Sequence, residues 1–200
     1  MMRRALDVVV ALLGLLLLSP LLLVIAVAVR IDSPGPVFFR QTRIGRHGVP
    51  FRIHKFRSMT DRPVEVAALQ LTVGMDARIT RIGHWLRRHR LDELPQLIDV
   101  LLGKMSLVGP RPEVPRYVAL YPQDLRAKVL SVRPGITDPA SLQFRDENAM
   151  LARAADPERE YIDKVMPIKL RLSAEYVDHA SLASDVRVIA QTIKVLLLGR

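Results

Sequence analysis

The sequence predicts a mainly α-helical protein with little β-structure, in which a re-entrant membrane helix hairpin joins interfacial amphipathic helices and a compact domain. Residues 5–29 are almost continuously apolar. Two later stretches, residues 76–90 and 185–198, repeat apolar side chains at helical spacing, and only short pieces such as residues 51–56 alternate as strands do. We therefore divide the chain into a membrane segment, residues 1–31, and a membrane-associated domain, residues 32–200.

The amino-acid composition limits the classes of molecule that this protein could bind. The 200 residues include 30 Lys and Arg against 20 Asp and Glu, which gives a net charge of +10 and indicates an anionic partner. Half of the residues are hydrophobic (50%), and a protein that is both basic and apolar points first to a membrane surface. Aromatic residues make up only 5%, which argues against a nucleic-acid-binding surface. The absence of cysteine excludes disulfides and thiolate metal sites.

The apolar segment at residues 5–29 exceeds the ~20 residues that a spanning helix needs. Ser19 and Pro20 interrupt its middle, and an interior proline bends a helix. Arginines flank both ends, so the positive-inside rule would keep both ends on the cytoplasmic side. These features favour a helix that enters the membrane, bends and returns to the same face, with the Ser19 hydroxyl bonded one turn back.

Two other interpretations of this segment stay open. A kinked helix that simply crosses the membrane satisfies the same length and hydropathy. A cleaved signal peptide is also conceivable, because residues 26–28 resemble its cleavage site.

The two amphipathic stretches are predicted to lie at the membrane interface. In residues 76–90 the apolar stripe consists of Ile79, Ile82, Trp85 and Leu86, surrounded by arginines. The alternative is that each stretch is an ordinary helix packed on the core.

Residues 92–103 form the best helix pattern in the chain. Asp92 suits the N-cap, Pro95 the first turn and Gly103 the position after the last turn. Asp92 and Glu93 follow Arg87 and Arg88, and arginines at a helix start grip phosphate oxygens. An aspartate beside bound phosphate can attack phosphorus, and an adjacent carboxylate can help to hold Mg²⁺. A capping role for Asp92 is the structural alternative.

Several motifs resemble one family. The run RRHRLDELPQLIDVLLGKMSLVGPRPEVP (residues 87–115) is similar to the core signature of the bacterial sugar transferases, the monotopic phosphoglycosyl transferases. The stretch after the apolar segment (residues 33–59), the Ser19-Pro20 break, RPGIT (residues 133–137) and the tail (residues 176–197) resemble further parts of this family in the right order.

The resemblance implies a catalytic domain on the cytoplasmic face of the bacterial inner membrane. Family members move a sugar 1-phosphate from a UDP-sugar to polyprenyl (undecaprenyl) phosphate and release UMP, as the first membrane step of polysaccharide or glycoconjugate assembly. By resemblance, Asp92 is the nucleophile that forms a covalent phosphosugar intermediate, and Asp92 and Glu93 hold Mg²⁺. The same resemblance assigns substrate binding to Lys55, Arg57, Arg87, Arg88, Arg111 and Asp185.

The chain departs from the family where RPGIT continues as DPASLQF, and residues 138–150 leave the sugar identity open. An exposed apolar surface on the hairpin is consistent with a homodimer. The main rival function is a non-enzymatic, membrane-anchored basic module that binds anionic lipid or a partner protein. That rival accounts for the charge and the apolar segment, but not for LDELPQ together with PRP.

Overall fold

The computed structural model describes residues 2–60 and 76–198 and is mainly helical, as the sequence predicted. Two separate pairs of strands are present in these ranges. The antiparallel pair is β1 (Phe38–Ile44) with β2 (Pro50–Phe56), and the parallel pair is β3 (Ser106–Val108) with β4 (Gly135–Thr137). The helices are α1 (Met2–Asp32), η1 (Arg46–Gly48), α2 (Arg81–Arg88), η3 (Leu91–Glu93), α3 (Gln96–Leu101), α4 (Pro115–Val118), α5 (Gln123–Val129), α6 (Pro139–Gln143), α7 (Glu147–Leu151), α8 (Pro157–Glu160), η4 (Tyr161–Val165), α9 (Met166–His179) and α10 (Leu182–Leu198).

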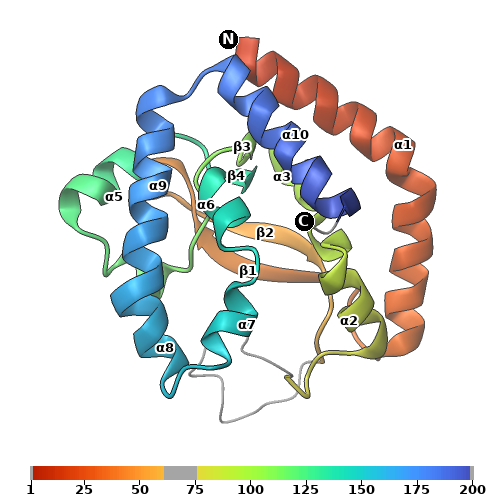
Figure 1. Ribbon diagram of the computed structural model, residues 1–200. Helices are drawn as coiled ribbons and strands as arrows, with labels where there is room; N and C mark the ends of the chain where they lie inside the picture. Colours follow the sequence, from red (N-terminus) through yellow and green to blue (C-terminus); the bar gives the residue numbers. More distant parts are fainter. Residues whose placement is uncertain (1, 61–75, 199–200) are drawn as a thin grey trace.

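The apolar segment forms one long helix, α1, which changes direction along its course on one side of the molecule (Figure 1). Pro20 lies inside it, and the Ser19 hydroxyl donates to the Leu16 carbonyl at 2.8 Å, as expected for a bend at this point. Proline removes only its own N–H from the helical ladder, so the helix continues on both sides. The structure therefore contains a bent helix where two arms of a hairpin were predicted, and the re-entrant path through a membrane stays a prediction.

Polar contacts anchor the beginning of α1 to the domain. Asp7 is buried, and its carboxylate accepts hydrogen bonds from the Ser106 hydroxyl at 2.6 Å and the Leu107 main-chain N–H at 3.0 Å. Arg4 donates to the Val100 carbonyl at 2.7 Å, at the end of α3. A lone acid in an apolar segment signals a polar partner, so Asp7 was the sequence signal for this anchor.

The end of α1 is fixed by Arg57, which follows β2. Its guanidinium donates to the carbonyls of Val29, Ser33 and Pro34 at 3.1, 2.6 and 3.0 Å. Gly35 has a φ of 124°, and a Cβ there would lie 2.2 Å from Arg57 Nη1. Only glycine therefore allows the chain to pass so close to this arginine.

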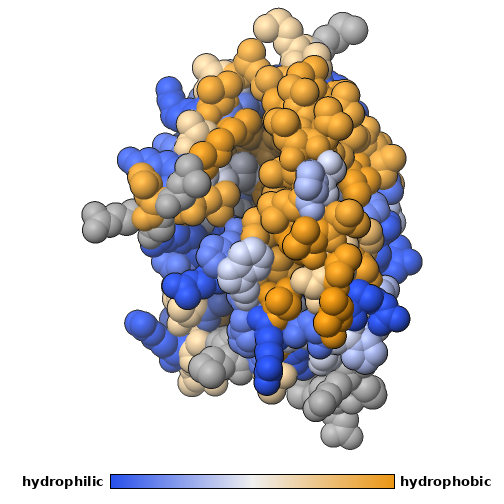
Figure 2. Space-filling model, turned by 90° about the vertical axis from the view of Figure 1, so that its right-hand side faces the viewer, coloured by the Kyte–Doolittle hydropathy of each residue, from blue (hydrophilic) through white to orange (hydrophobic). Residues whose placement is uncertain are grey.

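Apolar side chains cover the outer face of α1, as Figure 2 shows. By length and composition this helix could cross a membrane, and only 11% of its most apolar window is buried against the domain. The apolar stripe of α10 also faces outward, since Val186, Ile193 and Leu196 are about half exposed. In α2, Trp85 is exposed while Leu86 is fully buried, so this helix both packs on the core and presents an aromatic side chain outward.

The main core lies where α1, the β1–β2 hairpin, α3, β3, α9 and α10 meet. Its buried members include Ala11, Phe51, Ile53, Val100 and Met105. The strand predicted at residues 51–56 is thus confirmed, and its Phe51 and Ile53 side chains face the core. The hairpin lies in the middle of the fold, between α9 on one side and α1 with α2 on the other (Figure 1). This position brings β2 beside α3.

Two predicted helices begin later than their sequence patterns suggest. The helix of residues 76–90 starts at Arg81, because the Thr80 hydroxyl accepts from the Gly83 N–H at 2.9 Å as its N-cap. The helix of residues 92–103 starts at Gln96, and Asp92 lies in the preceding 3₁₀ turn without capping it. Gly103 has a φ of 75° after the last turn, as predicted.

Candidate active site

A sharp reversal between α2 and η3 aims the acidic pair into the domain. Arg90 adopts a left-handed conformation with φ 54° and ψ 22°, which is uncommon for a residue with a side chain. Its guanidinium donates to the Arg145 carbonyl at 3.2 Å, which helps to hold this turn. Backbone strain of this kind is often found at functional sites.

Glu93 lies between two cations from distant parts of the chain. Lys55 Nζ of β2 lies 2.7 Å from Glu93 Oε1, and Arg111 forms a two-pronged ion pair with the same carboxylate. Burial by itself would raise the pKa of Glu93, but Arg111 and Lys55 hold that pKa well below its ordinary value. Burial lowers the pKa of Lys55, although Glu93 opposes this shift. Glu93 is therefore the clamped member of the pair.

Asp92 has a different environment from its neighbour. Its side chain is buried, at 8% exposure, and in the described ranges no group donates a hydrogen bond to its carboxylate. Burial and the adjacent Glu93 raise its pKa, while Lys55, Arg87 and Arg111 partly oppose that shift. A carboxylate of raised basicity, free of donors and surrounded by cations, is suited to attack phosphorus.

Arg87 and Arg88, at the end of α2, precede this pair. Arg87 is close enough to lower the pKa of Asp92, and its Nη1 lies 3.8 Å from the Met59 sulfur. Arg88 is exposed to solvent. The structure thus brings Lys55, Arg87 and Arg111 to the acidic pair.

Two of the predicted substrate-binding residues lie in other contacts. Arg57 is almost fully buried, and its donors serve carbonyls at the end of α1. Asp185 pairs with Arg3 at 2.6 Å and accepts from the Tyr176 hydroxyl at 2.5 Å, which joins α1, α9 and α10. These contacts give both residues a structural role and lend no support to substrate binding.

A second network, absent from the sequence analysis, supports the loop that carries Arg111. Arg43 of β1 donates to the Pro112 carbonyl at 3.2 Å and pairs with Glu113 at 3.4 Å. Tyr161 donates to the other Glu113 oxygen at 2.7 Å, and Arg43 holds the pKa of Glu113 below its ordinary value against the effect of burial. The proximity of Glu113 to the PRP motif was the one available sequence signal.

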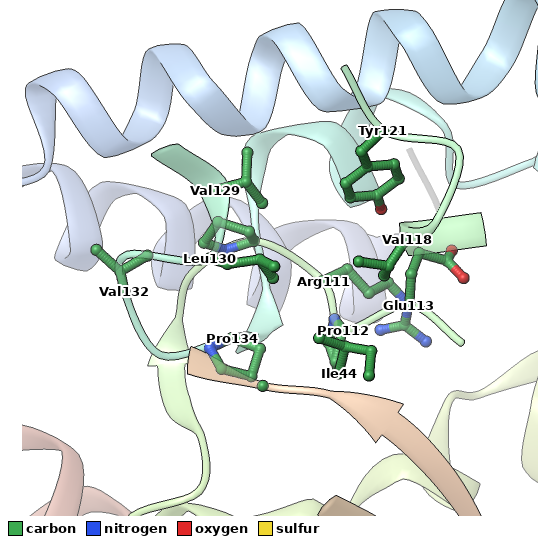
Figure 3. Close-up of a pocket in the computed structure, with 12 residues that line it drawn as sticks. Ile44, Arg111, Pro112, Glu113, Val118, Tyr121, Val129, Leu130, Val132 and Pro134 are labelled. Carbon is green, nitrogen blue, oxygen red and sulfur yellow. The ribbon is translucent and has the colours of Figure 1, made fainter. Parts of the chain in front are cut away.

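A recess lies behind this loop, between the end of β1, α4, α5 and the turn at Pro134 (Figure 3). Its lining is mainly apolar, with side chains such as Ile44, Val118 and Val129. Its charged lining residues are Arg111 and Glu113. Packing of apolar side chains here stabilises the main chain of the loop, so that Arg111 can reach Glu93.

The acidic pair fits the way in which proteins bind Mg²⁺. In the described ranges no group of three or more His, Cys, Asp or Glu side chains gathers as a metal site. Mg²⁺ usually takes only one or two protein carboxylates and completes its shell with water and substrate phosphates. Asp92 and Glu93 would supply these two carboxylates. Asp92 accepts no hydrogen bond from the described residues, whereas both oxygens of Glu93 are already paired with Lys55 or Arg111.

Comparison with known proteins identifies relatives of this chain. The UDP-glucose:undecaprenyl-phosphate glucose-1-phosphate transferase of Escherichia coli (strain K12) is 40% identical over 196 residues, covering 96% of this chain and 39% of that protein. The UDP-N-acetylgalactosamine-undecaprenyl-phosphate N-acetylgalactosaminephosphotransferase of Aeromonas hydrophila is 37% identical over 199 residues, covering 98% and 44%. The exopolysaccharide production protein PSS of Rhizobium leguminosarum bv. phaseoli is 37% identical over 201 residues, covering 96% and 93%.

The chain spans less than half the length of the first two relatives and nearly all of the third. A family model described as bacterial sugar transferase matches residues 1–199, which include α1, both sheets and the acidic pair. The chain therefore belongs to the bacterial sugar transferase family.

Proposed function

We propose that this protein transfers a sugar 1-phosphate from a UDP-sugar to undecaprenyl phosphate, with release of UMP, in the assembly of a polysaccharide or glycoconjugate. The observation that carries this proposal is the difference between the two neighbouring acids. Lys55 and Arg111 pair with the Glu93 carboxylate, whereas the buried Asp92 carboxylate accepts no hydrogen bond from the described residues. The names of the relatives supply the substrate classes.

In the first step, an Asp92 carboxylate oxygen attacks the phosphorus that carries the sugar. A new bond forms between this oxygen and phosphorus, and the pyrophosphate bond breaks. UMP leaves with the electron pair, and the sugar phosphate remains as an acyl phosphate on Asp92. Lys55, Arg87 and Arg111 are the donors that would orient the two phosphates and stabilise the charge on UMP as it leaves.

In the second step, a phosphate oxygen of undecaprenyl phosphate attacks the same phosphorus. The bond to Asp92 breaks, its carboxylate is regenerated, and the product is an undecaprenyl diphosphate sugar. Neither step requires a base to activate the nucleophile when Asp92 and the lipid phosphate react as anions. Mg²⁺, held through Asp92 and Glu93, would neutralise part of the pyrophosphate charge when bound.

The apolar surface of α1 supports a location in the bacterial inner membrane with the site on the cytoplasmic face. A lipid phosphate lies at headgroup depth, so a protein inserted to that depth meets its acceptor directly. Arginines at both ends of α1 favour a bent helix that returns to the cytoplasmic face. The exposed apolar stripe of α10 and the Trp85 side chain would then lie at the interface.

The test is a panel of UDP-sugars, including UDP-glucose and UDP-N-acetylgalactosamine, incubated with purified protein, Mg²⁺ and undecaprenyl phosphate. We expect one sugar to support continuous UMP release. Without acceptor, the same sugar should give a burst of UMP matching the amount of enzyme and a phosphosugar adduct on Asp92 by mass spectrometry. Acceptor-dependent release with neither burst nor adduct would exclude the covalent mechanism.

A non-enzymatic basic membrane module is the second candidate, favoured by the exposed apolar helices and the net charge of +10. It predicts binding to anionic vesicles and no UMP release with any sugar of the panel. Binding that is unchanged by Asp92→Asn, without turnover in either protein, would favour this candidate.

A further inference from the structure

A second polar contact holds β2 against α3, directly beside the pair formed by Lys55 and Glu93. The carboxylate of Asp99, in α3, is fully buried. Its Oδ2 accepts from the His54 main-chain N–H at 2.8 Å, and its Oδ1 lies 2.8 Å from His54 Nδ1. One carboxylate thus contacts both the main chain and the ring of a single residue.

The main-chain groups on the unpaired edge of β2 explain why the His54 N–H needs a hydrogen-bond acceptor. The strand pairs with β1 on one edge, so main-chain groups on its other edge must find partners elsewhere. Asp99 satisfies the His54 N–H, and the two donors of His54 in turn compensate a carboxylate that is strongly unfavourable to bury alone. The contact therefore fixes one point of β2 on α3.

The neighbouring residue on β2 carries the functional cation. Lys55 follows His54, and its Nζ lies 2.7 Å from Glu93, which precedes Asp99 on the same segment from η3 to α3. The β1 ladder and the core side chains Phe51 and Ile53 hold the strand as a whole. The two neighbouring contacts at His54 and Lys55 add a local constraint on the edge of β2 that faces η3 and α3. Such precision matters, because a displacement of about 1 Å at a reacting site can lower the rate roughly 10²-fold.

We propose that His54 and Asp99 are positioning residues. They hold β2 so that Lys55 stays paired with Glu93 and does not bond to the Asp92 carboxylate. Neither residue is expected to touch substrate. The effect on turnover rests on the proposed function, but the effect on the position of Lys55 does not.

The test is a double-mutant cycle. Asp99→Leu removes both contacts at similar volume, and we expect it to lower kcat about tenfold or more with a smaller change in KM. In a Lys55→Met background the same change should have little further effect, because contacting or coupled residues are not additive. Asp99→Asn should restore most of the rate, since its carbonyl can accept from the His54 main-chain N–H and its amide can donate to Nδ1 once the ring proton has moved to Nε2. An equal loss in both backgrounds, or no recovery in Asp99→Asn, would overturn the proposal.

A second readout needs no turnover. Buried and paired, Lys55 should react slowly with acetic anhydride, and Asp99→Leu should increase its acetylation severalfold, as measured by mass spectrometry. The matched control is Asp163→Leu, the same change at an exposed ion pair with Arg159 in another part of the chain, which should leave Lys55 labelling and kcat per folded molecule unchanged. If no UDP-sugar is turned over, faster labelling in Asp99→Leu still supports the positioning role, and unchanged labelling rejects it.

Discussion

The cluster around Glu93 and the cluster around Asp185 are built from the same kinds of groups. Each buries a carboxylate beside an arginine: Arg111 at the first and Arg3 at the second. At the second cluster, the Tyr176 hydroxyl completes the contacts of Asp185, and α1, α9 and α10 are held together. At the first cluster, a second carboxylate, Asp92, remains open.

The difference shows what distinguishes a reactive cluster from a structural one. A buried carboxylate with an arginine partner is by itself a means of joining segments, as it is at the three helices around Asp185. Chemistry requires in addition a carboxylate whose lone pairs no protein donor occupies, close to cations that can bind phosphate. The four predictions below test this distinction, beginning with the largest expected effect.

Asp92→Asn should lower UMP release by roughly 10⁴-fold or more, as loss of a nucleophile does in other enzymes. The folded protein should be at least as stable as the wild type, because the change removes a buried charge without breaking a hydrogen bond from any residue that the structure describes. Rates are compared with thermal unfolding in the same detergent. Retained activity would show that the open carboxylate is not the nucleophile.

Arg111→Lys should lower the rate about 10²-fold, because lysine keeps the charge but cannot grip a carboxylate or phosphate with two parallel donors. UMP release by the folded protein is the measurement. Arg133→Lys is the matched control, since Arg133 donates to the Gly103 carbonyl at 2.8 Å outside the acidic cluster. An equal loss of UMP release in the two variants would mean that the paired guanidinium donors of Arg111 have no special role in the reaction.

As pH falls, kcat/KM should decrease at a higher pH than the one at which the ion pairs of Glu93 with Lys55 and Arg111 are lost. Burial and Glu93 raise the pKa of Asp92, so protonation should begin above the ordinary aspartate value of ~3.9. The pKa of Glu93 is held low, so its stabilising effect is present above its unfolded pKa and is lost only as pH falls through the lower folded value. The contribution of Asp92 to folding stability depends on pH in the opposite direction. Because its pKa is raised in the folded protein, stability is lost as pH rises through that raised pKa.

A pH series of UMP release and of thermal unfolding separates these two effects. We expect activity to fall at a pH where the fold is still intact. Coincident loss of activity and fold would contradict the assigned directions.

Asp185→Asn should act on stability rather than on turnover. Loss of its charged hydrogen bonds should lower the free energy of unfolding by about 1–3 kcal/mol. We expect the lower end, because the Arg3 side chain is 37% exposed and water screens its charge. Chemical denaturation and UMP release per folded molecule measure the two quantities. A large loss of turnover in a stable protein would instead support the substrate-binding role that the family resemblance implies for Asp185.

Local patterns in the sequence predicted much of the fold. The long apolar helix with Pro20 inside it, the strand at residues 51–56 and the left-handed Gly103 all follow from periodicity and backbone preference. Helix starts were less accurate, because the Thr80 cap and the 3₁₀ turn at Asp92 depend on local hydrogen bonds that periodicity does not report.

The family resemblance assigned substrate binding to Lys55, Arg87 and Arg111. The structure places all three near the acidic pair, and their binding role stays a prediction. The resemblance assigned the same role to Arg57 and Asp185, whose side chains join α1 to the domain, and that role also stays a prediction. A motif indicates that a residue matters to the family. It does not give the contact partner of that residue, which depends on segments distant in the sequence.

The sequence alone determined that two carboxylates would be adjacent, that basic residues would accompany them, and that a long apolar helix would precede the domain. Only the tertiary structure decided which carboxylate is clamped. Lys55 and Arg111 lie 38 and 18 residues away from Glu93 in the sequence, and both reach it because β2 and the Arg111 loop pack beside η3. Periodicity and turn preferences act over a few residues, whereas the choice of an ionic partner depends on how separate segments pack in space.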